Sequence, residues 1–235
     1  MDARIKRFLA DKPLQSLPVA GFFANYPVKK SLVKGDFVLL CGVSDYPWTY
    51  LCGDNPEDLF SLLDEFDFES LYFANVEDWM IPMLTHERKI EWKLTTHRYY
   101  LPDNVTIEPT EHLSKPLDPS MAEYIYTRSS YKDFTSEAYI MERLQKDVSA
   151  GIWIKGELVG WGLTHDDTSL GFLHVMPAYR GQGLGESLLR SLIMEKRGRK
   201  KPVFLNVEPH NHQSINLVKK LGLHFDREVS WVKLV

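Results

Sequence analysis

The chain has 235 residues, of which 44% are hydrophobic, and it carries a formal net charge of −4 at pH 7. A chain of this size can bury one large core or two modest ones. Its mildly negative charge argues against nucleic acid as a partner. The first residues lack the apolar core of a secretion signal, and no apolar run is long enough to cross a bilayer. We therefore expect a cytoplasmic protein with no membrane partner.

Cys41 and Cys52 are the only two cysteines, and both lie in apolar stretches of the first half. Buried thiols are expected at both positions, with a disulfide as the alternative. The second half contains no cysteine, so the sequence excludes a thiol nucleophile there.

The first half shows alternating apolar residues and turn formers, which indicate short strands and helices. The predicted elements are strands over 36–41, 48–51 and 71–74, a helix that begins at Pro56, and a second helix near 76–84. A turn-rich stretch, Pro102-Asp103-Asn104, follows them. We therefore predict a first domain over 1–104 and a second over 105–235.

The second half has a clearer order of elements. The predictions are a strand over 105–108, helices over 119–131 and 137–148, strands over 151–155, 157–163 and 170–175, a helix containing 188–193, a strand over 203–207, a helix after Asn211 and a strand over 229–234. This order predicts an α/β (α+β) fold in which helices flank a mixed central sheet.

The most informative segment joins the strand 170–175 to the helix that follows it. It reads Val-Met-Pro-Ala-Tyr-Arg-Gly-Gln-Gly-Leu-Gly over 175–185, with glycine at every second position from 181. Glycines let backbone N–H groups approach an anion closely, and the start of the helix adds its positive dipole end. Arg180 adds a fixed positive charge. The pattern predicts a site for a phosphate or diphosphate group.

Two other phosphate-binding loops do not fit this segment. A nucleotide-hydrolase loop needs Gly-Lys-Ser/Thr, whereas Gly185 is followed by Glu186 and Ser187. A dinucleotide-binding turn needs Gly-x-Gly-x-x-Gly, whereas the spacing here is Gly-x-Gly-x-Gly.

The segment from Arg180 to Gly185 resembles the Arg/Gln-x-x-Gly-x-Gly/Ala element of the GNAT superfamily of coenzyme A-dependent N-acyltransferases. A second element of that superfamily is similar to a downstream series here: Asn211, Ser214, Leu217, Val218, Lys220, Gly222 and Leu223. The resemblance implies a GNAT fold over the second half. The first half resembles, in architecture alone, the smaller, degenerate GNAT-like first domain of two-domain acyltransferases such as glycine N-acyltransferases.

The resemblance also implies a ligand, acetyl-CoA or coenzyme A, held as a co-substrate in an opening between the fourth and fifth strands. By carry-over, the backbone of Leu173, His174 and Val175 would pair with its pantetheine arm. The expected diphosphate-binding residues are Arg180, Gly181, Gln182, Gly183, Leu184, Gly185 and Glu186. Asn211 and Ser214 would line the other wall. No metal is expected, although His210 and His212 flank Asn211.

Proton transfer is where the sequence departs from its relatives. The positions that carry the base in glycine-type and arylalkylamine-type relatives fall on Ser169 and Gly171, and the tyrosine that protonates the leaving thiolate is replaced by Val218. Glu208, which ends the strand 203–207, is the predicted catalytic base. His174 is the alternative base, weighed against the reading of a core histidine.

The function that follows is an N-acyltransferase, most simply an acetyltransferase, that moves its acyl group directly to the amine of a small molecule in a ternary complex. Two alternatives stay open: a protein or peptide acceptor, and a coenzyme A-binding regulatory domain without turnover. Transfer from aminoacyl-tRNA ranks third, because a net negative chain suits tRNA poorly. A monomer or a homodimer is expected.

Overall fold

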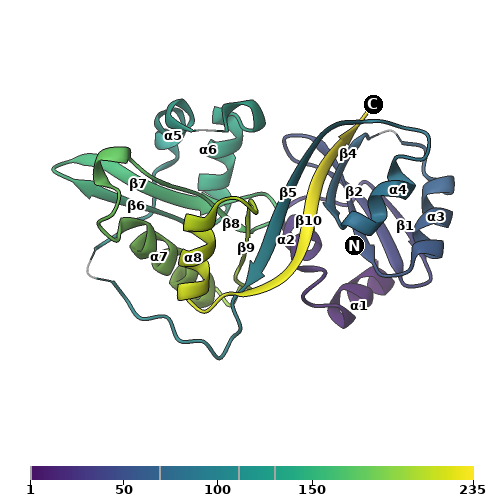
Figure 1. Ribbon diagram of the computed structural model, residues 1–235, viewed down its shortest axis with the longest axis horizontal. Helices are drawn as coiled ribbons and strands as arrows, with labels where there is room; N and C mark the ends of the chain where they lie inside the picture. Colours follow the sequence, from purple (N-terminus) through teal and green to yellow (C-terminus); the bar gives the residue numbers. More distant parts are fainter. Residues whose placement is uncertain (1, 69, 111, 130) are drawn as a thin grey trace. The chain divides into compact units, whose positions relative to one another are not determined.

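The computed structural model describes residues 2–68, 70–110, 112–129 and 131–235. Contacts group the chain into two compact units (Figure 1). The first unit contains the residues up to Tyr99 together with Val207–His212 and Phe225–Val235. The second contains Tyr100–Asn206 and Gln213–His224. These units are defined by contacts, whereas the predicted boundary at residue 104 separates two domains of the kind seen in the resembling family. That boundary stays a prediction.

The first unit is a sheet with helices on both faces. Its elements are α1 (Ala3–Asp11), α2 (Leu17–Asn25), β1 (Lys30–Lys34), β2 (Phe37–Val43), β3 (Pro47–Gly53), α3 (Pro56–Glu65), β4 (Tyr72–Val76), α4 (Ile81–Leu84), β5 (Ile90–Tyr100) and β10 (His224–Leu234). The strand order is β1-β2-β3-β4-β10-β5. β3 and β4 are parallel, whereas β1 pairs antiparallel with β2, and β2 pairs antiparallel with β3.

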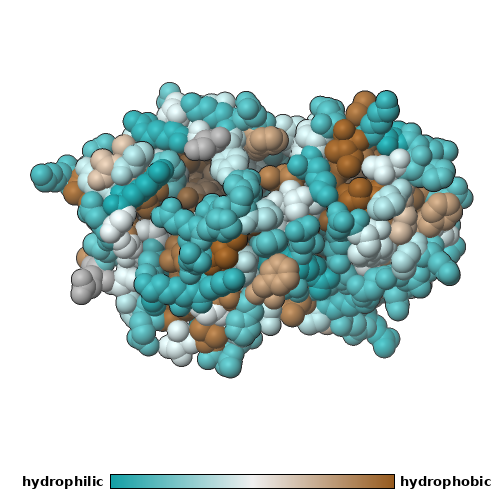
Figure 2. Space-filling view, viewed as in Figure 1, coloured by the Kyte–Doolittle hydropathy of each residue, from teal (hydrophilic) through white to brown (hydrophobic). Residues whose placement is uncertain are grey.

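Side-chain alternation along β2 explains why both faces of this sheet are covered. Phe37 and Leu39 belong to the apolar cluster that contains α3 residues, whereas Val38 and Leu40 belong to the cluster with α1 and α2. Successive residues of a strand point to opposite faces, so a continuous apolar run requires burial on both sides. In the space-filling view most visible side chains are hydrophilic, and apolar ones form small patches (Figure 2).

The last strand lies in the first unit, although the sequence analysis placed it with the second half. β10 pairs antiparallel with β4, with Ser230 opposite Val76 and Val232 opposite Phe73. Val232 and Leu234 are fully buried in the cluster that contains α3. The sequence pattern predicted the strand itself but carries no signal for its partner.

The second unit contains a four-stranded part of the sheet in the order β9-β8-β7-β6. Its elements are α5 (Ala122–Arg128), α6 (Glu137–Lys146), β6 (Ser149–Ile154), β7 (Glu157–Thr164), β8 (Leu170–Val175), α7 (Leu184–Gly198), β9 (Phe204–Val207) and α8 (His212–Lys220). An apolar cluster joins α5 and α6 to one face of β7. α7 packs on the other face, where Gly160 and Gly162 admit Leu188 and Leu192. The predicted fold class, a mixed sheet flanked by helices, is confirmed.

Two predictions for this half need correction. No strand forms over 105–108, because Arg197 of α7 donates hydrogen bonds to the carbonyl oxygens of Val105 and Pro102 and so holds this stretch outside the sheet. The helix predicted over 119–131 ends at Arg128, and its residue 130 lies outside the described residues.

Cys41 and Cys52 are thiols and not a disulfide, as predicted, with Cys52 buried and Cys41 partly buried. Burial raises the pKa of Cys52 to about 12, so its thiol stays protonated at neutral pH. In the part of the chain that the structure describes, no helix combines the length and the apolar character needed to pass through a bilayer.

Candidate acyl-carrier site

The glycine loop has the backbone geometry that its composition predicts. After β8 the chain makes a 3₁₀ turn over Pro177–Tyr179, and α7 begins at Leu184. Gly181 and Gly183 both have left-handed backbones, with φ of 76° and 78°. Residues with a side chain rarely adopt this conformation, so glycine is strongly favoured at both positions.

The start of α7 is open to an anion. Its N-cap residue is Gly183, which has no side chain to cap the first backbone N–H groups of the helix. A Cβ atom built at Gly181 or Gly183 would meet no heavy atom within 4 Å, and both residues are exposed. Arg180 donates from Nε to the Val175 carbonyl at 3.0 Å, which holds its guanidinium beside the loop. These residues fit a diphosphate group.

Glu186 is the one predicted diphosphate ligand with the wrong charge for an anion. Its carboxylate is paired with Lys220 of α8 at 2.5 Å and with Arg190 at 2.9 Å. Hydrogen bonds from Lys220 and then from Arg190 hold the pKa of Glu186 below its usual value, so the carboxylate stays ionised and neutralised. A diphosphate would meet the backbone N–H of Glu186 rather than an unpaired negative charge.

β8 carries a bulge next to the predicted pantetheine-binding backbone. Trp161 pairs with His174 and Leu163 pairs with Gly171, so Phe172 and Leu173 both lie opposite the single residue 162 of β7. Phe172 has a left-handed backbone, with φ of 49°. A bulge of this kind turns backbone groups away from the regular ladder.

The other edge of β8 is open beyond its first residue. β8 and β9 run parallel, and within the described residues their register contains one pair, Leu170 with Leu205. Leu173, His174 and Val175 lie further along β8, past that pair. Their backbone groups on this edge therefore lie outside the ladder between the two strands, as an acyl carrier inserted there would require.

His174 is half-buried, and its ring stacks on Trp161 with 4.4 Å between centroids and 16° between planes. Burial, and then the positive charge of Arg180, lower the pKa of His174 below its ordinary 6.5. The imidazole is therefore neutral at pH 7. Trp161 belongs to the apolar cluster with α5 and α6, so His174 lies on that face of β8.

The ring of His165 lies against Gly171, a contact that the sequence analysis missed. A Cβ atom at Gly171 would lie 2.1 Å from its Nε2 atom, so the His165 ring occupies the space that a side chain at 171 would need. The ring also packs on Phe172, with 4.6 Å between centroids. A glycine inside an apolar strand was the available signal, because such a glycine often marks a close approach of another group.

The remaining predicted residues lie around the loop between β9 and α8. Glu208 pairs with His210 at 3.4 Å, and its carbonyl accepts a hydrogen bond from the Asn211 N–H at 2.9 Å. Ser214 lies in the first turn of α8. By contacts, Glu208 and Asn211 group with the first unit, whereas Ser214 groups with the second, together with β8 and the glycine loop.

Lys196 begins a basic run over 196–201 at the end of α7, but it is not part of the solvated helix end. Lys196 is fully buried and donates to the Thr168 carbonyl at 2.5 Å, with Asp147 at 4.0 Å. Burial lowers the pKa of Lys196 to about 8, and Asp147 opposes the shift. Because Lys196 lies inside the unit, it is not available to a phosphate at the surface.

The family model described as "FR47-like protein" matches residues 149–232, which contain β8, the glycine loop and α8. The chain is thus similar, over part of its length, to acetyltransferases of the GNAT kind. A Bacillus subtilis (strain 168) protein, named provisionally as a [ribosomal protein bS18]-alanine N-acetyltransferase, is similar to part of this chain. It is 29% identical over 128 residues, which is 51% of this chain and 78% of that protein.

Solved structures share the fold over most of the chain. A Drosophila protein superposes with a TM-score of 0.74 at 19% identity, covering 85% of this chain and 74% of its own. A GCN5-related N-acetyltransferase from Kribbella flavida has a TM-score of 0.59 at 12% identity, covering 94% of each chain. A tandem GNAT protein from the clavulanic acid biosynthesis pathway has a TM-score of 0.51 at 16% identity, covering 93% and 87%. At these identities the likeness concerns the tandem GNAT-like fold.

Proposed function

We propose that the chain is an N-acyltransferase that moves an acetyl group from acetyl-CoA directly to the amine of a small molecule. The observation that carries the proposal is the start of α7, where two left-handed glycines and an uncapped helix end leave room for a diphosphate. The GNAT superfamily, which residues 149–232 resemble, uses acetyl-CoA as a co-substrate, and this supports the assignment of that site.

In this proposal the chain acts mainly by holding and aligning its two substrates. Backbone N–H groups from Gly181 to Glu186 bind the diphosphate, while the open edge of β8 over 173–175 aligns the acyl arm. Alignment of an amine with a thioester lowers the barrier by several kcal/mol, and one fixed N–H on the developing oxyanion contributes about 3 kcal/mol. Asn211 and Ser214 are proposed for the opposite wall.

Two observations favour other functions of the same site. The name of the Bacillus relative favours a protein N-terminus as the acceptor. Gly171 and the core residue Val218, which is 2% exposed, replace the usual acid and base residues and so favour a coenzyme A-binding domain without turnover. We further propose a cytoplasmic location, to which two cysteines without a disulfide between them are suited, and a monomeric or homodimeric state.

Ligand-linked melting together with thiol release tests the function. Coenzyme A at a hundred times its dissociation constant stabilises the folded chain by about 2.7 kcal/mol, which for a chain of this size raises the melting temperature by about 5–10 °C. Release of free thiol from acetyl-CoA with one of a panel of amino acids, polyamines and aminoglycosides is the expected second result. Release of free thiol with an alanine-terminated peptide, and with no small amine, would indicate that the acceptor is a protein. A melting shift without release would indicate a binding domain.

A pair of glutamine variants tests the base. We propose Glu208, and we expect Glu208→Gln to lower kcat by about 10²–10⁴-fold with unchanged affinity for coenzyme A. His174→Gln, the matched control, should lower kcat less than tenfold. If His174 were the base, activity would fall as pH drops through a value below 6.5, because burial and Arg180 depress its pKa, and His174→Gln would abolish that limb. That result would reject Glu208.

A further inference from the structure

The two units repeat one order of elements, so the openings beside their parallel strands can be compared. Two helices, three antiparallel strands, a helix and a parallel strand follow one another as α1 to β4 in the first unit and as α5 to β9 in the second. β3, α3 and β4 therefore correspond to β8, α7 and β9. In the first unit the parallel ladder runs from Trp48 with Tyr72 to Tyr50 with Ala74 and then stops.

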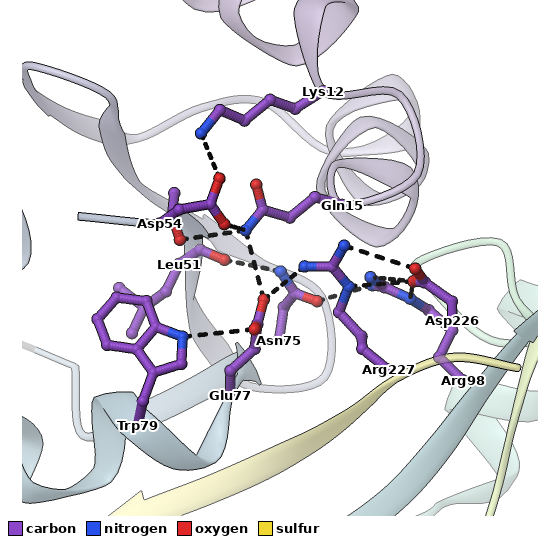
Figure 3. A network of polar contacts seen from close by, with 11 residues as sticks. Lys12, Gln15, Leu51, Asp54, Asn75, Glu77, Trp79, Arg98, Asp226 and Arg227 are labelled. Atoms are coloured by element: carbon purple, nitrogen blue, oxygen red, sulfur yellow. Dashed lines mark hydrogen bonds and ion pairs between the residues drawn. The ribbon is translucent and has the colours of Figure 1, made fainter. Parts of the chain in front are cut away.

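The side chain of Asn75 fills the place where that ladder stops. Asn75 has a left-handed backbone, with φ of 61°, and is 1% exposed. Its amide Nδ2 donates to the Leu51 carbonyl of β3 at 2.7 Å (Figure 3). This side-chain hydrogen bond joins β3 to β4. In the second unit, the corresponding gap between β8 and β9 is proposed to bind the pantetheine arm.

Asn75 is held in this position by a buried ion pair. Arg98 of β5 is fully buried and donates from Nη1 to Asn75 Oδ1 at 2.9 Å and from Nε to Asp226 Oδ2 of β10 at 2.7 Å. Both ends of the Asn75 amide therefore have partners. A ligand amide that replaced Asn75 at Leu51 would have to displace this arrangement.

Gln15 closes the end of β3 in the same way. Its Nε2 atom donates to the Gly53 carbonyl at 3.1 Å and to Asp54 Oδ1 at 2.7 Å, and Lys12 pairs with Asp54 Oδ2 at 2.6 Å (Figure 3). All these partners of Gln15 are acceptors, which fixes the orientation of its amide. The carbonyls at the end of β3 are thus bound by the unit's own side chains.

The start of α3 also differs from that of α7. Asn55 caps α3, because its Oδ1 atom accepts hydrogen bonds from the backbone N–H groups of Glu57 and Asp58. Glu57 and Asp58 lie in the first turn of α3, and Asp54, which is paired with Lys12, precedes the cap. A diphosphate there would meet satisfied N–H groups and negative charge.

We propose that the first unit is a sealed GNAT-like module, which means that its own side chains occupy the positions where a carrier would bind. The chain therefore binds one acyl carrier, in the second unit alone. Asn75 and Gln15 donate the hydrogen bonds to the carbonyls at the end of β3 that a carrier would otherwise donate. Asn55 accepts the hydrogen bonds from the start of α3 that a diphosphate would otherwise accept. The second part of the proposal rests on the proposed function of the second unit.

Titration calorimetry with coenzyme A counts the sites. One mole of coenzyme A per mole of full-length chain is expected, and no binding heat is expected for Gly183→Asp. Asn75→Gly, which permits the left-handed backbone and removes the amide, should melt at a lower temperature yet bind coenzyme A within twofold of the wild-type affinity. Gln15→Ala should behave in the same way if Asn75→Gly fails to fold.

The outcomes separate the two proposals. Two sites in the wild type, or one site that survives Gly183→Asp, would overturn the sealed first unit. A loss of affinity above tenfold in Asn75→Gly or Gln15→Ala would do the same, because it would place these side chains in a carrier site. A wild type with no site at all would reject the proposed function of the second unit and agree with a sealed first unit.

Discussion

Gly183→Asp should weaken binding of coenzyme A by at least about 100-fold while leaving the chain folded. An aspartate at this position would place a carboxylate at the uncapped start of α7, where the diphosphate is proposed to bind. Two like charges about 4 Å apart repel by about 4 kcal/mol near a protein surface, and salt screens part of this repulsion. The exposed position and the open space around it predict no clash.

The matched control is Gly183→Asn, which has the same shape without the charge. Asparagine and aspartate both tolerate the left-handed backbone, at a cost of about 1 kcal/mol. The control should therefore share the stability loss and bind coenzyme A much more tightly than the aspartate variant. Calorimetry and melting curves on the two proteins measure both quantities. Equal affinities in the two variants would show that this loop does not meet the diphosphate.

Asp226→Ala should destabilise the chain by about 3–5 kcal/mol, the second large effect. The Asp226 carboxylate accepts from Arg98 at 2.7 Å, and the Arg98 side chain has no exposed surface. Removal of one partner leaves a buried charge without compensation, which costs far more than an exposed ion pair is worth. Urea unfolding followed by circular dichroism gives the change in the free energy of unfolding.

Two controls show whether the loss comes from the buried charge. Asp11→Ala breaks an exposed pair with Arg7 in the same unit, and it should cost less than about 1 kcal/mol. The double variant Arg98→Met/Asp226→Leu removes both charges, and it should recover much of the stability lost in Asp226→Ala. If Asp226→Ala were as stable as the wild type, the charge of Arg98 would have to be compensated by water or by another side chain.

The glycine loop could be predicted because its signal is local. Alternate glycines after an apolar strand and before an amphipathic helix define a turn within about ten residues, and left-handed backbones at 181 and 183 agree with that pattern. The order of elements in the second unit was predictable for the same reason. The roles of the individual site residues stay predictions.

The parts that escaped prediction depend on contacts between distant residues. α2 is apolar on nearly all sides, so it shows no helical period, and tertiary burial of Val19 and Phe22 defines it. The segment 105–108 has strand-like residues, yet Arg197 binds its backbone. Arg98 and Asp226 are 128 residues apart, and nothing in either local sequence indicates their pairing.

The pairing of β10 with β4 has a consequence for biosynthesis. The strand that completes the sheet beside Tyr72–Val76 is translated after every other element of the chain. One edge of β4 therefore stays unpaired during synthesis until residues 224–234 have been added to the chain. A nascent chain in that state needs protection from edge-to-edge aggregation, and a gene dissected at the midpoint would encode a first half that lacks one of its own strands.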